Sequence, residues 1–129
     1  MGIFRVNIAV GDPQGQHYTT AEALVDTGSS YNALPASFLQ RLGVLPHERR
    51  QFELADGRIV ERDVGQTWVQ IDSRTAIVPV VFADEGTEAL LGAVTLEIFG
   101  LAVDPVRQRL VPVPGLLMAN PHRPQHDAP

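Results

Sequence analysis

One acidic residue stands between an apolar run and a turn of small residues, and this junction constrains the fold more than any other feature. Residues 23–25 (Ala-Leu-Val) predict the end of a buried strand, and residues 28–30 (Gly-Ser-Ser) predict a bend. Asp26 lies where the strand ends, and a carboxylate that loses water there needs compensating hydrogen bonds or charges. Asp26 is therefore either a turn residue whose side chain hydrogen-bonds the nearby backbone or a carboxylate that takes part in a reaction.

The composition bounds the class of protein and its partners. With 129 residues, 44% hydrophobic and 19% charged, the chain has the length and composition of one globular domain. It has no cysteine, which excludes disulfides, and its first residues lack a signal-peptide pattern, so we expect a cytoplasmic protein. A net charge of −5 without a basic stripe argues against binding to nucleic acid. The longest uncharged apolar stretch, residues 110–121, contains three prolines and is too short to span a bilayer, so no membrane partner is expected.

Alternating apolar residues and turn residues predict an all-β domain with two short helices. Strands are expected over residues 3–10, 17–25, 49–55, 58–64, 67–71, 75–82, 101–103 and 109–113. Helical spacing predicts one helix over residues 34–42 and another over residues 93–99, which carries Val94 and Ile98 at that spacing. We expect the domain to span residues 1–113, followed by a Pro-rich tail, residues 114–129, that is flexible at its end.

Three motifs occur in one order along the chain. Residues 26–28 (Asp-Thr-Gly) follow an apolar strand, and Asp56-Gly57 then predicts the tip of a β-hairpin. Residues 89–92 (Ala-Leu-Leu-Gly) lead into the second helix. In these motifs, over residues 3–113, the sequence resembles the retropepsin-like aspartic proteases. The resemblance implies a closed, β-barrel-like acid-protease fold with one lobe in each chain.

The resemblance also implies roles for individual residues. Asp26 is expected to be the catalytic carboxylate, with the Gly28 N–H pointing at it and the Ser29 hydroxyl donating to its outer oxygen. Thr27 is expected to bind the partner's loop across a two-fold axis. The remaining expected site residues are Ser30 in the active-site loop, Ala55, Asp56, Gly57 and Arg58 at the tip of a substrate-covering flap, and Leu91 and Gly92 in a supporting second loop.

The chain has one Asp-Thr-Gly triplet, which supplies half of a paired-carboxylate site. Two neighbouring carboxylates cannot both ionise cheaply, so they share one proton, and aspartic proteases are the standard case. The ionised partner activates a water as general base while the protonated one donates to the peptide carbonyl. The resemblance therefore implies a homodimeric aspartic endopeptidase that joins two Asp26 carboxylates, acts on peptides and needs no cofactor.

Other interpretations stay open. The same fold can form a non-catalytic dimeric module for peptide binding or assembly, and a dimer that forms only transiently would make activity depend on concentration. His122 and His126 are four residues apart, but they stand in a Pro-containing tail without a metal motif, so no metal site is expected. The serines of the loop lack the Gly-x-Ser-x-Gly elbow of a serine hydrolase.

Overall fold

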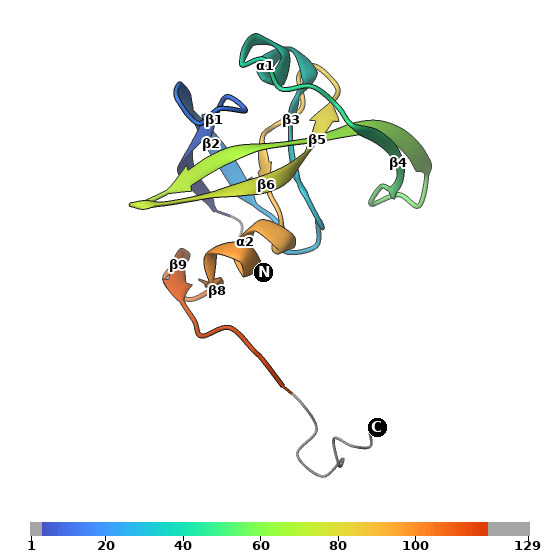
Figure 1. The fold of residues 1–129 in the computed structure, drawn as a ribbon. Coiled ribbons are helices and arrows are strands. Elements are labelled where there is room, and N and C mark those ends of the chain that lie inside the picture. Colours follow the sequence, from blue (N-terminus) through green and yellow to red (C-terminus); the bar gives the residue numbers. More distant parts are fainter. Residues whose placement is uncertain (1–3, 119–129) are drawn as a thin grey trace, which may run out of the picture.

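The part of the chain that the structure describes, residues 4–118 of a computed structural model, is built mainly from β-strands (Figure 1). The strands are β1 (Arg5–Gly11), β2 (Tyr18–Val25), β3 (Asn32–Pro35), β4 (Glu48–Glu53), β5 (Ile59–Ile71), β6 (Arg74–Ala83), β7 (Leu90–Leu91), β8 (Leu101–Asp104) and β9 (Arg109–Pro112). Two helices occur within these residues, α1 (Ala36–Arg41) and α2 (Ala93–Phe99). The predicted fold class, mainly β with two short helices, is confirmed.

Seven strands form one sheet in the order β1-β2-β7-β3-β6-β5-β4. Strand β1 also pairs with β5 through Ala9 and Val10, so the sheet closes into a ring and β4 lies outside it. The short strand β7 lies between β2 and β3, parallel to β2 and antiparallel to β3. The loop that joins β2 to β3, residues 26–31, must therefore pass the end of β7.

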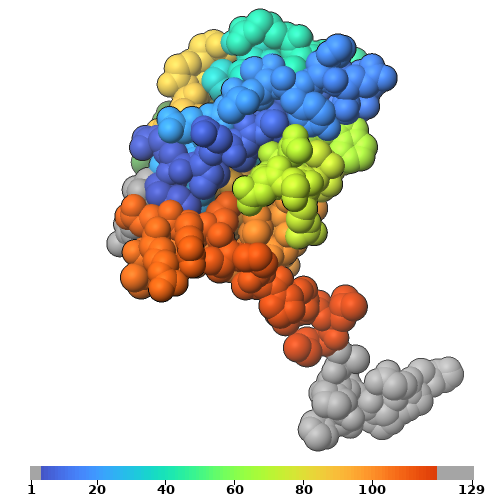
Figure 2. All heavy atoms as spheres, turned by 90° about the vertical axis from the view of Figure 1, so that its left-hand side faces the viewer, coloured from blue at the N-terminus to red at the C-terminus, as the bar shows by residue number. Residues whose placement is uncertain are grey.

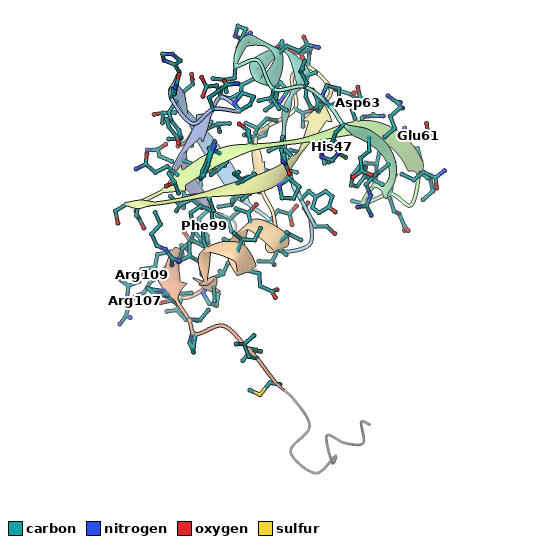
Figure 3. All side chains as sticks on the ribbon, in the orientation of Figure 1. His47, Glu61, Asp63, Phe99, Arg107 and Arg109 are labelled. Carbon is teal, nitrogen blue, oxygen red and sulfur yellow. The ribbon has the colours of Figure 1, made fainter. Side chains whose placement is uncertain are left out.

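The hydrophobic core fills this ring and continues under the helices. Strand β6, which the long apolar run predicts to be central, lies between β3 and β5 and contributes Val78 and Val80 to the core. Phe99, at the end of α2, is 2% exposed and faces the sheet (Figure 3). Burying a side chain of this size contributes about 2 kcal/mol, so the core fixes α2 beside the strands that carry the motifs.

Helix α2 has the predicted bounds but buries a different face. Residues Thr95, Leu96 and Phe99 are buried, whereas Ile98, which the helical spacing placed with the apolar residues, is 45% exposed. The helix has seven residues with apolar side chains on more than one face, so packing against the sheet decides which face is covered. The prediction of the helix is confirmed, and its expected apolar stripe is wrong.

Two other predicted elements differ from the structure. Residues 32–35 form strand β3, so α1 begins only at Ala36. Strand β5 is continuous over thirteen residues, where a break was expected around Gly65. Gly65 stays paired with Val80, and a Cβ on it would lie 2.7 Å from the Leu45 carbonyl oxygen. This glycine therefore allows another backbone to approach and does not end a strand.

After α2 the chain forms a separate two-stranded sheet from β8 and β9. Residues 113–118 then extend away from the rest of the chain (Figure 2). Residues 1–3, where the first strand was expected to begin, and residues 119–129, which hold most of the expected tail with His122 and His126, lie outside the described residues. Neither helix in the described part is long and apolar enough to cross a membrane.

Candidate active site

The loop that follows β2 is held by the segment that runs from β7 into α2. The Asp26 N–H donates to the Leu91 carbonyl oxygen at 3.0 Å, so the loop leaves β2 in contact with β7. The first N–H groups of α2, from Ala93 and Val94, donate to the carbonyl oxygens of Ser29 and Ser30 at 2.8 and 2.9 Å. Two of the orphan donors at the helix N-terminus are thus satisfied by the loop, and these bonds fix its path.

Both oxygens of the Asp26 carboxylate accept a hydrogen bond from this loop. The Gly28 N–H donates to Oδ1 at 2.9 Å, and the Ser29 hydroxyl donates to Oδ2 at 3.0 Å, so both predicted hydrogen bonds are present. The first is also the bond of an ordinary turn aspartate, so it does not by itself distinguish the two interpretations of Asp26. The carboxylate is half-buried in the single chain, which leaves it accessible to a water or to a second carboxylate.

Asn32 is a site residue that the sequence analysis missed. It is 0% exposed, and its Oδ1 accepts the Gly92 N–H at 2.9 Å, which joins β3 to the start of α2. At Gly92 itself a Cβ would lie 2.6 Å from the Tyr31 carbonyl oxygen, so the site tolerates only glycine. The signal was the period of two: Asn32 shares the buried face of β3 with Leu34.

The predicted hairpin is present, formed by β4 and β5 with its turn at residues 54–58. The turn closes through a bond from the Leu54 N–H to the Arg58 carbonyl oxygen at 2.8 Å, and Gly57 has the positive φ of 88° that the turn requires. Asp56 accepts the Arg58 backbone N–H and its guanidinium, at 3.0 and 2.8 Å. These two bonds lower the pKa of Asp56 below its ordinary value of 3.8, and the bond from the backbone N–H has the larger effect.

A cavity of about 780 Å³ lies between the active-site loop and the hairpin. From the loop it is lined by Gly28, Ser29, Ser30 and Tyr31. From the hairpin it is lined by residues 50–54 with Val60 and Arg62. Asp26 does not belong to its wall. The predicted flap-tip residues 55–58 do not belong to it either, and on the hairpin side the wall consists of the stem and Leu54.

Side chains of the stem contact the loop directly. Arg50 donates from Nη1 to the Tyr31 hydroxyl at 2.7 Å, and its guanidinium carbon lies 5.4 Å from the Tyr31 ring centroid. Phe52 meets the same ring edge-to-face, with centroids 6.1 Å apart. Sequence analysis missed these three residues, because their contact depends on how the hairpin folds over the loop.

Comparison of the sequence with models of protein families shows to which family the chain belongs. A family model described as aspartyl protease matches residues 6–95, which contain the loop, the hairpin and Gly92. The chain belongs to this aspartyl protease family. No curated protein sequence matches it. Among residues 4–118, no three His, Asp or Glu side chains gather as a metal site.

Solved structures of aspartic proteases have the same fold. EIAV protease complexed with the inhibitor HBY-793 is 20% identical, with a TM-score of 0.58 over 77% of this chain and 89% of that chain. The protease of simian foamy virus (mac) is 17% identical, with a TM-score of 0.54 over 74% and 94%. A retropepsin-like aspartic protease from Rickettsia conorii is 21% identical, with a TM-score of 0.52 over 80% and 86%. The predicted retropepsin-like fold is confirmed.

Proposed function

We propose that this family member is a homodimeric aspartic endopeptidase in which the Asp26 carboxylates of two copies form one site. The observation that carries the proposal is the fixed, half-buried Asp26 carboxylate, which has one hydrogen-bond donor on each oxygen and lies on a loop that borders a large cavity. Holding both oxygens in place fixes the geometry in which a water can be deprotonated. An Asp that served only as a turn residue would need neither the cavity nor the support from α2.

The proposed reaction needs two carboxylates within hydrogen-bond reach of one water. One Asp26 is ionised and accepts the proton of the attacking water, while the other is protonated and donates to the carbonyl oxygen of the scissile peptide. The water oxygen bonds to the carbonyl carbon. The C–N bond then breaks as the leaving nitrogen takes the proton that the first Asp26 accepted, and the second Asp26 regains a proton from a hydroxyl of the intermediate. No cofactor takes part.

A second copy supplies what one chain lacks. The sequence has a single Asp-Thr-Gly triplet, so a symmetric dimer is the simplest source of the second carboxylate. Thr27 is exposed in the single chain, which supports a role for it in contacting the partner's loop. Leu91 and Gly92 support the loop from within the chain.

The hairpin and the cavity suggest how a peptide binds. An extended peptide would lie beneath the hairpin with side chains in the cavity, and residues 55–58 would close over it as the flap tip. Residues 1–113 form the catalytic domain in this proposal, and residues 114–129 form a tail outside it. The absence of cysteine agrees with a cytoplasmic location, which we keep as part of the proposal.

Cleavage of a degenerate peptide library, measured at several protein concentrations and from acidic to neutral pH, tests this function. We expect activity that rises more steeply than linearly with concentration and that Asp26→Asn abolishes while the protein stays folded. Asp72→Asn is the matched control, because Asp72 stands in a turn with a positive φ of 56° that Asn tolerates equally well. Activity retained by Asp26→Asn contradicts the proposal, and a folded dimer that cleaves nothing favours the binding-module alternative.

A further inference from the structure

Two arginines lie directly opposite one another on the cavity side of the hairpin. Arg50 of β4 and Arg62 of β5 are register partners, so their side chains project from the same face of the hairpin. Both residues line the cavity, and Phe52, two positions after Arg50, contacts Tyr31 from that face. Like charges in directly opposed positions destabilise a strand pair, so this arrangement needs anions nearby.

Only one of the two arginines has a carboxylate partner within residues 4–118. Arg62 donates from Nη2 to Asp84 Oδ2 at 3.0 Å. The side chain of Arg50 has one hydrogen-bond partner in this range, the Tyr31 hydroxyl, although a guanidinium carries five N–H donors. Glu53 also belongs to the cavity wall, but its odd offset from Arg50 along β4 directs its side chain to the opposite face of the strand. Donors of Arg50 are therefore available to a ligand.

On the basis of the proposed protease function, we propose that Arg50 is a specificity-determining residue and that the cavity selects an acidic side chain of the bound peptide. The Tyr31 hydroxyl and ring hold the guanidinium in place before a ligand arrives, so less conformational entropy is lost on binding. The planar guanidinium can donate two parallel hydrogen bonds to a carboxylate. Tyr31 and Phe52 offer apolar surface to the methylene groups of a Glu side chain.

The whole chain carries a net charge of −5, so an acidic peptide gains nothing from long-range attraction. Selection must arise at short range, where the two positive charges of Arg50 and Arg62 are balanced by only one paired carboxylate, that of Asp84. Arg50 is exposed, so the preference should be of the size of a surface ion pair and should weaken as salt is added.

The test uses end-capped peptides that are identical except for Glu, Gln or Lys at one position, which is moved along the peptide. Two quantities are measured: kcat/KM with the wild type, and Kd with Asp26→Asn, which binds without cleaving. At one position we expect Glu to be favoured over Gln about fivefold in low salt. Arg50→Gln should remove this preference, and Arg50→Lys should retain part of it.

Arg49→Gln is the matched control. Arg49 is the next residue of β4 and faces away from the cavity, where Nη1 lies 3.0 Å from Asp63 Oδ1 and Nε lies 3.5 Å from Glu61 Oε1. Figure 3 labels both acidic residues on the hairpin. Removing this arginine lowers the charge of the hairpin by the same amount but should leave the Glu preference unchanged.

The outcomes separate this inference from the proposed function. Cleavage that depends on Asp26 but shows no Glu preference, or the same preference in Arg50→Gln, overturns the role of Arg50 and leaves the protease proposal intact. The same peptides without end caps are measured as well. A preference that follows their free C-terminal carboxylate, and not the Glu side chain, also overturns the role of Arg50. If the wild type cleaves nothing while Asp26→Asn binds Glu peptides through Arg50, the protease proposal fails and the selection of an acidic side chain stands. Absence of both binding and cleavage overturns the inference.

Discussion

The active-site loop and the tip of the hairpin are both short turns, but different parts of the chain hold them. The loop, residues 26–31, and Asn32 directly after it are bonded to residues about sixty positions later, at the start of α2 and in β7. The tip, residues 54–58, has the backbone bonds from Leu54 and Gly57 and the Asp56–Arg58 contacts, all formed within the turn. The loop is therefore coupled to the core behind it, whereas the bonds of the tip do not involve the core, so we expect the tip to open more easily. This difference suits the proposed roles of a fixed carboxylate in the loop and of a cover at the tip that admits a substrate.

Among the changes that test this difference between loop and tip, Gly92→Ala is expected to have the largest effect on stability. The new Cβ would lie 2.6 Å from the Tyr31 carbonyl oxygen and 2.9 Å from that of Ser29, both of them backbone atoms of the loop. We expect the free energy of unfolding to fall by about 3 kcal/mol and cleavage to be lost. Urea denaturation and the peptide assay measure the two effects.

Gly57→Ala is the matched change in the tip. A Cβ at Gly57 has nothing within 4 Å, so the cost is limited to the positive φ of 88°, about 1 kcal/mol and confined to the turn. Equal losses of stability in the two alanine variants contradict the distinction between the regions.

Asn32→Ala is expected to lose less stability than Gly92→Ala and more than Gly57→Ala. The change leaves the buried Gly92 N–H without an acceptor, which costs about 2 kcal/mol. Asn7→Ala, on the exposed face of β1, is the control and should change stability by less than about 0.5 kcal/mol. If Asn32→Ala is as stable as the control in urea denaturation, Asn32 does not support the loop.

The smallest effect concerns pH and the hairpin tip. Because bonds from Arg58 lower the pKa of Asp56 in the folded protein, the charged form stabilises the turn above the ordinary pKa of 3.8. This contribution is lost as the pH falls through the lowered value. We expect the NMR shift of the Arg58 amide to titrate with a midpoint below 3.8 and this titration to vanish in Asp56→Asn. A midpoint at or above 3.8 contradicts the contact.

Local signals predicted most of the fold. The Asp56-Gly57 turn, the long apolar strand β6 and the helix before Gly100 depend on neighbours in sequence, and these predictions are confirmed. Strand β3 was missed because a run of four residues between a turn and a helix forms a strand only when β6 and β7 pair with it. The sequence pattern contains no signal for that pairing.

The contacts of the candidate site also divide into local ones, which the sequence predicts, and long-range ones, which it does not. The bonds from Gly28 and Ser29 to Asp26 span two and three residues, so the motif alone could predict them. The bond from Gly92 to Asn32 spans sixty residues, and the contact between Arg50 and Tyr31 spans nineteen residues across the cavity. Such contacts follow from topology, and they decide how the loop is held and where the Arg50 guanidinium lies in the cavity wall.

Mixing subunits tests most directly whether two Asp26 carboxylates form one site. Wild type and Asp26→Asn are combined at a constant total concentration, allowed to exchange subunits, and assayed for peptide cleavage. If one site is shared by two copies, activity falls with the square of the wild-type fraction, to about one quarter in an equal mixture. Activity that falls in direct proportion, to about one half, means that each chain acts by itself and contradicts the shared site.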